Sequence, residues 1–569
     1  MSKQCHPSGQ PGAGDDAPEP GALPAQRPAP PAGARPPTER EAAPGRAGRA
    51  APPWPDRMRP LVRTPMAERP VLAGAEPRER PGPAEASRVL DLALRVGESL
   101  LASGESAEDV EGAMLGVAHA YRVYPCEPQV TFTLVAISHQ PTPDDPPLTA
   151  ERAVRRPASD YTRLADVFRL VSAITAGEVA AERACERLTA LTAHRRPPYP
   201  EWLLVPASGL LAGSATLLVG GRADSRAWLV FAIAFVAALT GDRLAALVAR
   251  HDLPEFYGFV IAATPAAAIG SLLSLNGLQL RGSVVITGGL FALLPGRPLV
   301  AAAQDGLTGF YLTAAARLLE VLYLMAGIVI GVMTVLYLGV SGEADLTPDA
   351  GPGSTVNPPL QLAAAMLLAL AFAVLLRTDR ATLVLVVLNS AAGWTTYAVL
   401  TDARVEPIVA TGLAAGLVGL FGQLMARYRA MSALPHVTAA LGPLMPGAAL
   451  YFGMLAFVQG RPEAGCSWVG RACATAMALA IGVNLGGEVA RLFLPASGRA
   501  FTSRRPAGRH RRRGHRRVRR PSPRGEPVPS TRCGPAGASS GGASSAGDAR
   551  PTDVGFRRWP TTRRRPRSG

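Results

Sequence analysis

The sequence lacks most features of an ordinary soluble enzyme. Only 18% of its 569 residues are charged, and it contains a single lysine, Lys3. Its six cysteines form no Cys-x-x-Cys pair and lie near no histidine at a metal-ligand spacing, which argues against a disulfide framework and a zinc site. It contains no nucleophile elbow, catalytic metal motif or glycine-rich phosphate loop, and its first residues form no apolar signal segment. We therefore expect no enzymatic activity, no bound metal and no cofactor.

The two ends of the chain are polar and strongly biased in composition. Residues 1–85 hold 20 prolines with no apolar period, and residues 498–569 hold 20 arginines against three acids. Such segments bury too little apolar surface to offset the entropy lost on folding, so residues 1–86 and 498–569 are predicted to be disordered. The arginine-rich end has no interleaved aromatic residues. We therefore expect it to contact the anionic inner leaflet of a bilayer and no specific nucleic acid.

A small soluble α+β domain is predicted for residues 87–196. Apolar residues recur at helical spacing up to Gly104, which is a stop signal, and Ser106 with Asp109 is typical of the N-cap of a second helix. The remaining predicted elements are a strand or hairpin over 129–138 and two helices over 160–175 and 178–194. The domain shows no catalytic constellation, so we interpret it as a regulatory or gating domain.

The segment from residue 202 to residue 494 is a series of apolar runs. Each run is close to the ~20 residues that a helix needs to cross a hydrocarbon core of ~30 Å. Ten spans are predicted, five in residues 202–340 and five in residues 360–495, with residues 341–359 as an external linker. Arginine is more frequent in the loops on the side of the N-terminal domain, so the positive-inside rule places both termini in the cytoplasm. The predicted fold class is mainly α, a polytopic protein of a bacterial-type plasma membrane.

Two proline-glycine pairs interrupt the apolar runs, Pro295-Gly296 and Pro446-Gly447. Proline removes a backbone donor and clashes with the preceding turn, so each helix should break there. The two pairs lie 151 residues apart, and an odd number of spans per half predicts two five-helix repeats of opposite orientation. Inverted repeats with helices broken at matching positions are typical of alternating-access transporters. The alternative is two kinked helices without a role in transport.

Ionisable residues within the apolar runs are candidates for a substrate or proton pathway, because each costs a few kcal/mol in a bilayer. Asp305 follows the first proline-glycine pair by about ten residues. Arg317 and Glu320 are three residues apart and can pair on one helix face, as can Glu488 and Arg491.

The chain resembles the threonine/serine exporter family over residues 87–494. The resemblance is carried by RVGESLLASGESAEDVE at 95–111, SDYTRLADVFRLVSAITAGEVAAERACERL at 159–188 and GGLFALLPGRPLVAAAQDGLTGFYLTAAARLLEVL at 288–322. It implies export of small hydroxy amino acids from the cytoplasm, driven by the proton motive force. The second half departs from the first, because Ala456 stands where a repeat of Asp305 would be. The positions that match the family pattern are Pro295, Gly296, Asp305, Gly309, Arg317 and Glu320.

These patterns predict a secondary active exporter of threonine or serine coupled to protons, while self-association into a homo-oligomer is left open. Asp305 or Glu320 would bind the ammonium group of the amino acid, and free backbone N–H groups at the first break would bind its carboxylate. One alternative is an exporter of dicarboxylates or other small organic anions, in which Arg317 and Arg471 bind the solute. The other is a membrane-anchored sensor or regulatory protein. The predicted pathway residues are Pro295, Gly296, Asp305, Gly309, Arg317, Glu320, Pro446, Gly447 and Glu488.

Overall fold

The structure is a computed structural model of the chain. The described residues are 53–65, 69, 81–142, 144–154, 160–193, 198–220, 224–251, 253–275, 282–341, 357–429 and 431–493. The C-terminal segment 498–569 lies outside them, as does most of the predicted linker 341–359.

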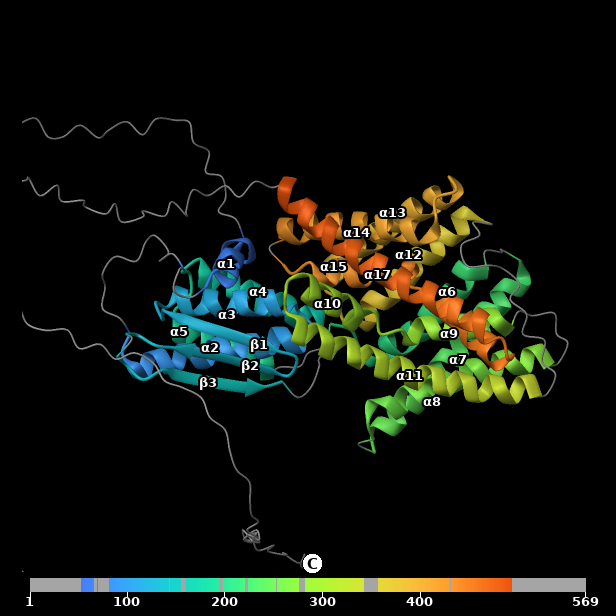
Figure 1. Cartoon of the computed structure of the whole chain (residues 1–569), viewed down its shortest axis with the longest axis horizontal. Helices are drawn as coiled ribbons and strands as arrows, with labels where there is room; N and C mark the ends of the chain where they lie inside the picture. The colour runs from blue at the N-terminus through green and yellow to red at the C-terminus, as the bar shows by residue number, and fades with distance from the viewer. Residues whose placement is uncertain are drawn as a thin grey trace, which may run out of the picture. The chain divides into compact units, whose positions relative to one another are not determined.

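The N-terminal domain is α+β and contains a three-stranded antiparallel sheet. Strands β1 (Cys126–Thr131), β2 (Leu134–His139) and β3 (Leu148–Ala153) are paired in that order. The segment predicted as a strand or hairpin is the β1–β2 hairpin, whereas β3 was missed because its exposed sequence LTAERA lacks an apolar alternation. Figure 1 shows helices α2 (Pro83–Ala102) and α3 (Ala107–Ala120) packed against this sheet. Helices α4 (Tyr161–Thr175) and α5 (Ala181–Ala193) complete the domain.

The local signals between the first two predicted helices are confirmed. Gly104 ends the first helix with a φ of 88°, a left-handed conformation that glycine adopts without strain. The Ser106 hydroxyl accepts a hydrogen bond from the N–H of Asp109 at 3.2 Å and so caps the N-terminus of α3.

The prediction of disorder for residues 1–86 is wrong for residues 83–86, which begin α2, and for an earlier stretch that forms helix α1 (Trp54–Arg63). Trp54, Met58 and Leu61 are buried on one face of this helix, and the Trp54 ring lies 4.8 Å from the ring of Phe168 on α4. The many prolines of residues 1–85 led to the prediction of disorder, although these three apolar residues recur at helical spacing. Three buried apolar side chains are enough here because the rest of the domain supplies the surface on which they pack.

Among the described residues after the N-terminal domain, eight helices are long and apolar enough to cross a membrane. A ninth candidate is the pair α9 (Gly282–Leu293) and α10 (Gly296–Leu307), which is bent by 54° at its break. The eight are α6 (Glu201–Gly220), α7 (Ser225–Ala249), α8 (Glu255–Leu275), α11 (Tyr311–Ser341), α12 (Pro358–Leu375), α13 (Arg380–Asp402), α14 (Pro407–Arg429) and α17 (Pro462–Phe493).

The predicted number of ten spans is therefore corrected to eight continuous helices and one bent pair. The segment predicted as the ninth span, 437–458, is covered by α15 (Leu434–Thr438), the 3-10 turn η2 (Gly442–Leu444) and α16 (Gly447–Val458). None of these reaches the ~20 residues that a span needs, because Pro443 lies within η2 and Pro446 directly precedes α16.

The two membrane halves contain corresponding elements, except that α15 and η2 of the second half stand where the first half has the single helix α9. Helices α10 and α16 each have 12 residues and begin 151 positions apart. Both end in the same turn, because the N–H of Phe310 donates to the C=O of Asp305 at 2.8 Å and the N–H of Arg461 to the C=O of Ala456 at 2.9 Å. The turns contain Gly309 and Gly460, with φ values of 94° and 70°. The contacts also correspond, since α8 packs on α11 as α14 packs on α17.

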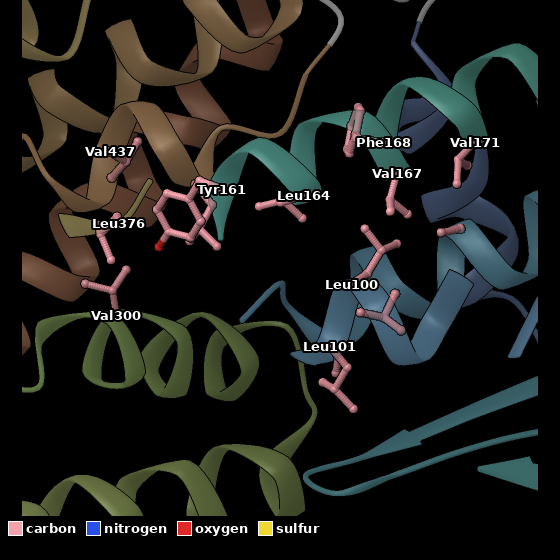
Figure 2. Close-up of a cluster of buried hydrophobic side chains, with 14 of the residues drawn as sticks. Leu100, Leu101, Tyr161, Leu164, Val167, Phe168, Val171, Val300, Leu376 and Val437 are labelled. Carbon is pink, nitrogen blue, oxygen red and sulfur yellow. The ribbon is translucent and has the colours of Figure 1, made fainter. Parts of the chain in front are cut away.

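The N-terminal domain shares one apolar core with the membrane helices. Tyr161, the first residue of α4, lies among Val300 of α10, Leu376 at the end of α12 and Val437 of α15, as Figure 2 shows. Its N–H donates to the C=O of Leu376 at 3.1 Å, and its hydroxyl donates to Thr438 at 3.3 Å. The start of α4 is therefore anchored to both membrane halves.

Candidate functional site

Both predicted helix interruptions are confirmed, and each is closed by the same turn. Pro295 has φ −78° and ψ 59°, and the N–H of Gly296 donates to the C=O of the residue before the proline at 2.8 Å. Pro446 has φ −81° and ψ 44°, and the N–H of Gly447 makes the equivalent hydrogen bond at 2.9 Å. These are inverse γ-turns, in which one hydrogen bond closes over a single residue.

The two breaks pack against each other. A Cβ atom at Gly296 would overlap the side chain of Met445, and a Cβ atom at Gly447 would lie 2.8 Å from the ring of Phe291 and 3.3 Å from Leu294. Leu294 and Met445 occupy the same position, one residue before the proline, in their respective breaks. Each glycine therefore leaves room for the side chain that precedes the proline of the other break.

A buried ion pair joins the two helices that follow the first break. Arg317 Nη1 on α11 lies 2.9 Å from Asp305 Oδ2 on α10, and both side chains are buried. The turn at Gly309 reverses the chain and lets α10 and α11 pack side by side. The predicted pairing of Arg317 with Glu320 is not formed within the described residues, because Arg317 turns to the more deeply buried carboxylate. Pairing with Arg317 offsets the desolvation penalty of Asp305, which is larger than that of Glu320 because Asp305 is more deeply buried.

Backbone groups of the N-terminal domain complete this ion pair. The N–H of Ala107, the first residue of α3, donates to Asp305 Oδ1 at 2.8 Å. Arg317 Nη2 donates to the C=O of Glu105 at 2.8 Å. A helix N-terminus presents unpaired N–H groups and a partial positive charge, which stabilise a carboxylate. One oxygen of Asp305 is thus held by the N-terminal domain and the other by α11.

The side chain of Glu105 reaches the second membrane half. The hydroxyl of Ser432 donates to Glu105 Oε2 at 2.7 Å. Burial of this carboxyl group, reinforced by the charge of Asp109, raises its pKa to about 8, although Ser432 and Arg317 favour the ionised form. The segment Ser103–Ala107, which we call the docking turn, therefore contacts α10 and α11 of the first half and Ser432 of the second.

The predicted pair of Glu488 and Arg491 on α17 is formed. Glu488 also lies 3.5 Å from Arg59 Nη1 of α1, and Arg59 pairs in turn with Glu108 and Asp109 of α3. Helix α1 therefore links the N-terminal domain to the last membrane helix.

Two cavities lie beside these contacts. The first, of about 120 Å³, adjoins the second break and is lined by Trp394, Thr411 and Arg471, among other residues. The second, of about 100 Å³, is lined by α1, the docking turn, α10, α14 and α17. Asp305 lines neither cavity, but its neighbour Gln304 lines the second. Within the described part of the chain, no group of three or more His, Cys, Asp or Glu side chains could hold a metal ion.

The sequence did not reveal the residues that the N-terminal domain contributes. Ala107 and Glu105 act on the ion pair through backbone groups, which carry no residue-type signal. The contact of Glu105 with Ser432 crosses 327 residues. The only available signal was the N-cap at Ser106, which located a helix N-terminus but not the carboxylate that it binds.

Comparison with known proteins gives consistent matches over most of the described residues. A family described as "Putative threonine/serine exporter" matches residues 91–339, and a family described as "Threonine/Serine exporter, ThrE" matches residues 361–488. The "Probable threonine/serine exporter" of Mycobacterium tuberculosis is 33% identical over 423 residues, which is 72% of this chain and 78% of that protein. The "Threonine/serine exporter" of Corynebacterium glutamicum is 31% identical over 413 residues, 71% of this chain and 82% of that protein. No solved structure matches the chain.

Proposed function

The chain belongs to the threonine/serine exporter family, and on that premise we propose that it exports threonine and serine from the cytoplasm across a bacterial plasma membrane. The two named relatives are the basis for the choice of solute, and a multi-pass helical membrane protein is the architecture that such a function needs.

The observation that carries the proposal is the mutual packing of the two proline-glycine breaks. The breaks belong to two halves whose elements correspond apart from α9, which α15 and η2 replace, and they meet between these halves. Each break leaves the first N–H groups of a helix, α10 or α16, without intrahelical partners inside an apolar bundle. We infer that the halves are inverted repeats and that their relative movement opens a path first to one side of the membrane and then to the other.

The orientation follows from charge. The arginine-rich loops and the N-terminal domain lie on the same side in the sequence prediction, so this side is assigned to the cytoplasm together with both termini. The docking turn then closes the cytoplasmic face, because it contacts both membrane halves there.

Proton coupling is assigned to Asp305. As a carboxylate it accepts a hydrogen bond from Ala107 and pairs with Arg317. A proton that arrives from outside would neutralise Asp305 and weaken both contacts, because a neutral carboxyl group loses the charge that makes these bonds strong. The docking turn would then be released and the cytoplasmic face would open to the amino acid. Loss of the proton to the cytoplasm would restore the closed state.

The test is transport by the purified full-length chain in proteoliposomes. Vesicles loaded with labelled threonine or serine should lose label when a pH gradient is imposed, and excess unlabelled serine should slow the loss of threonine. Competition by succinate, with no effect of serine, would instead assign the protein to small organic anions. Vesicles that release no solute under any gradient would overturn the exporter function and favour a sensor.

A further inference from the structure

The cavity of about 100 Å³ beside the docking turn is lined by polar groups from both domains. Gln304 of α10, Gln423 of α14 and Asn484 of α17 place side-chain amides along it. Among the described residues, the amides of Gln304 and Gln423 form no hydrogen bond to the protein, so both can bind a solute. Ionisable side chains of both kinds also line it: Arg59, Arg427, Arg491, Asp56, Glu105, Asp109 and Glu488.

The equivalent place that the repeat would create, between α16, α8 and α11, lacks these polar side chains. The positions 151 residues from Gln304, Gln423, Asn484 and Glu488 are occupied by Leu455, Leu272, Met333 and Tyr337. Leu272 and Tyr337 are exposed on the bundle surface, where lipid would surround them, and Leu455 is buried. Because the same helix arrangement forms with these residues at the equivalent positions, the fold itself does not require the amides. Polar side chains inside a membrane bundle are costly and mark solute pathways.

We propose that this cavity is the cytoplasmic binding site for the exported amino acid, and that Gln304 and Gln423 recognise the side-chain hydroxyl of threonine or serine. The inference rests on the proposed export function and adds the site and its specificity residues. The N-terminal domain is part of the site, because Arg59 and Glu105 belong to it.

The chemistry of the cavity fits a small zwitterion with a hydroxyl group. The arginines of the lining, which pair here with Asp56, Asp109 and Glu488, match the carboxylate of the amino acid, and these three acids match its ammonium group. A cavity needs roughly 10–15 Å³ for each water-sized group, so about 100 Å³ has room for an amino acid of the size of serine or threonine. An amide that binds a hydroxyl group discriminates strongly against the isosteric valine, because valine leaves the amide unpaired.

The experiment measures binding of labelled threonine to the purified full-length chain, with valine and serine as competitors. The wild type should prefer threonine to valine. Replacing Gln423→Leu, which installs the leucine found at its counterpart Leu272, should weaken threonine binding about tenfold and leave valine binding unchanged. Gln304→Leu should act in the same direction. Thr411→Val, an isosteric change in the other cavity, is the matched control and should leave the preference intact.

The outcomes separate this inference from the export function. If proteoliposomes export threonine but Gln423→Leu and Gln304→Leu both keep the wild-type preference for threonine over valine, the site is wrong and export stands. The same holds if Thr411→Val alone removes the preference, since the solute then binds in the other cavity. Should Gln423→Leu not yield a monodisperse protein, Gln423→Asn is used, and it should weaken threonine binding without altering valine binding. If the wild type transports no amino acid, both proposals fail.

Discussion

Leu294 and Met445 lie 151 residues apart and make reciprocal contacts. Leu294 lies against Gly447, and Met445 lies against Gly296. A two-fold axis between identical subunits generates contacts of this kind, in which residue i of one subunit touches residue j of the other and residue j of the first touches residue i of the second. Here the two partners belong to one chain, so the pair relates its two halves.

The close approach of the breaks can be tested at Gly296. A Cβ atom there would overlap the flexible end of the Met445 side chain, so Gly296→Ala must displace this side chain and should cost about 1 kcal/mol of stability. Thermal unfolding of the purified protein in detergent measures the loss. The double variant Gly296→Ala with Met445→Ala makes room for the added methyl group and should recover part of the stability. If the double variant is less stable than the sum of the two single effects, the breaks do not pack as described.

The role of Asp305 can be tested by removing its charge without changing its shape. Asp305→Asn should abolish export driven by a pH gradient, to below about a tenth of the wild-type rate, because an amide cannot carry the proton. The variant should still insert in the membrane, since Asn can accept the hydrogen bond from Ala107. Glu463→Gln, at an exposed acid on α17, is the control and should transport normally. Undiminished proton-driven export by Asp305→Asn would contradict the assignment.

The burial of the ion pair makes a prediction about stability. Arg317→Met should destabilise the protein by about 3–5 kcal/mol, because it leaves the charge of Asp305 buried without its partner. The double variant Asp305→Asn with Arg317→Met removes both charges, so most of the lost stability should return while proton-driven export stays absent. Unfolding in detergent and transport in vesicles measure the two effects separately. Equal stability of the single and double variants would show that the pair is not buried.

The elements that the sequence predicted well depend on local rules. Runs of apolar residues located all eight continuous helices, because each run must match the thickness of a bilayer. Both breaks were located because proline acts on its own helix, wherever that helix packs. The number of spans was overestimated at 437–458. The total hydrophobicity of this segment is typical of a span, but it does not show that the segment is divided into α15, η2 and α16.

The contacts that close the site could not be predicted, because they are non-local. The hydrogen bond from Ala107 to Asp305 crosses 198 residues, and alanine gives no indication that its N–H binds a carboxylate. Arg317 had two acids within reach in the sequence, Asp305 and Glu320, and only the packing of α10 against α11 decides between them. Helix α1 was missed for a related reason, since Trp54 is stabilised by Phe168, which lies far along the chain.

The docking turn should release as the pH rises, because burial disfavours the ionised form of Glu105. Its pKa is about 8 when docked and 4.5 as an ordinary exposed group. Between these two values the docked state keeps a proton that the released state has lost, so the free energy of docking falls as the pH rises from about 4.5 to about 8. Below this window both states are protonated and above it both are ionised, so docking should not vary with pH there.

Hydrogen exchange of the amide of Ala107, corrected for its intrinsic pH dependence, reports this release because that N–H is held by Asp305 only when the turn is docked. In the wild-type chain the corrected exchange rate should rise across the window relative to that of Glu105→Gln. This variant can still accept the hydrogen bond from Ser432 but cannot ionise at position 105, so its corrected rate should not rise, and loss of the proton from Asp305, which strengthens the bond to Ala107, can only lower it. If the corrected rate rises equally in both proteins, another group controls docking, and if it rises in neither, the turn does not respond to pH in this range.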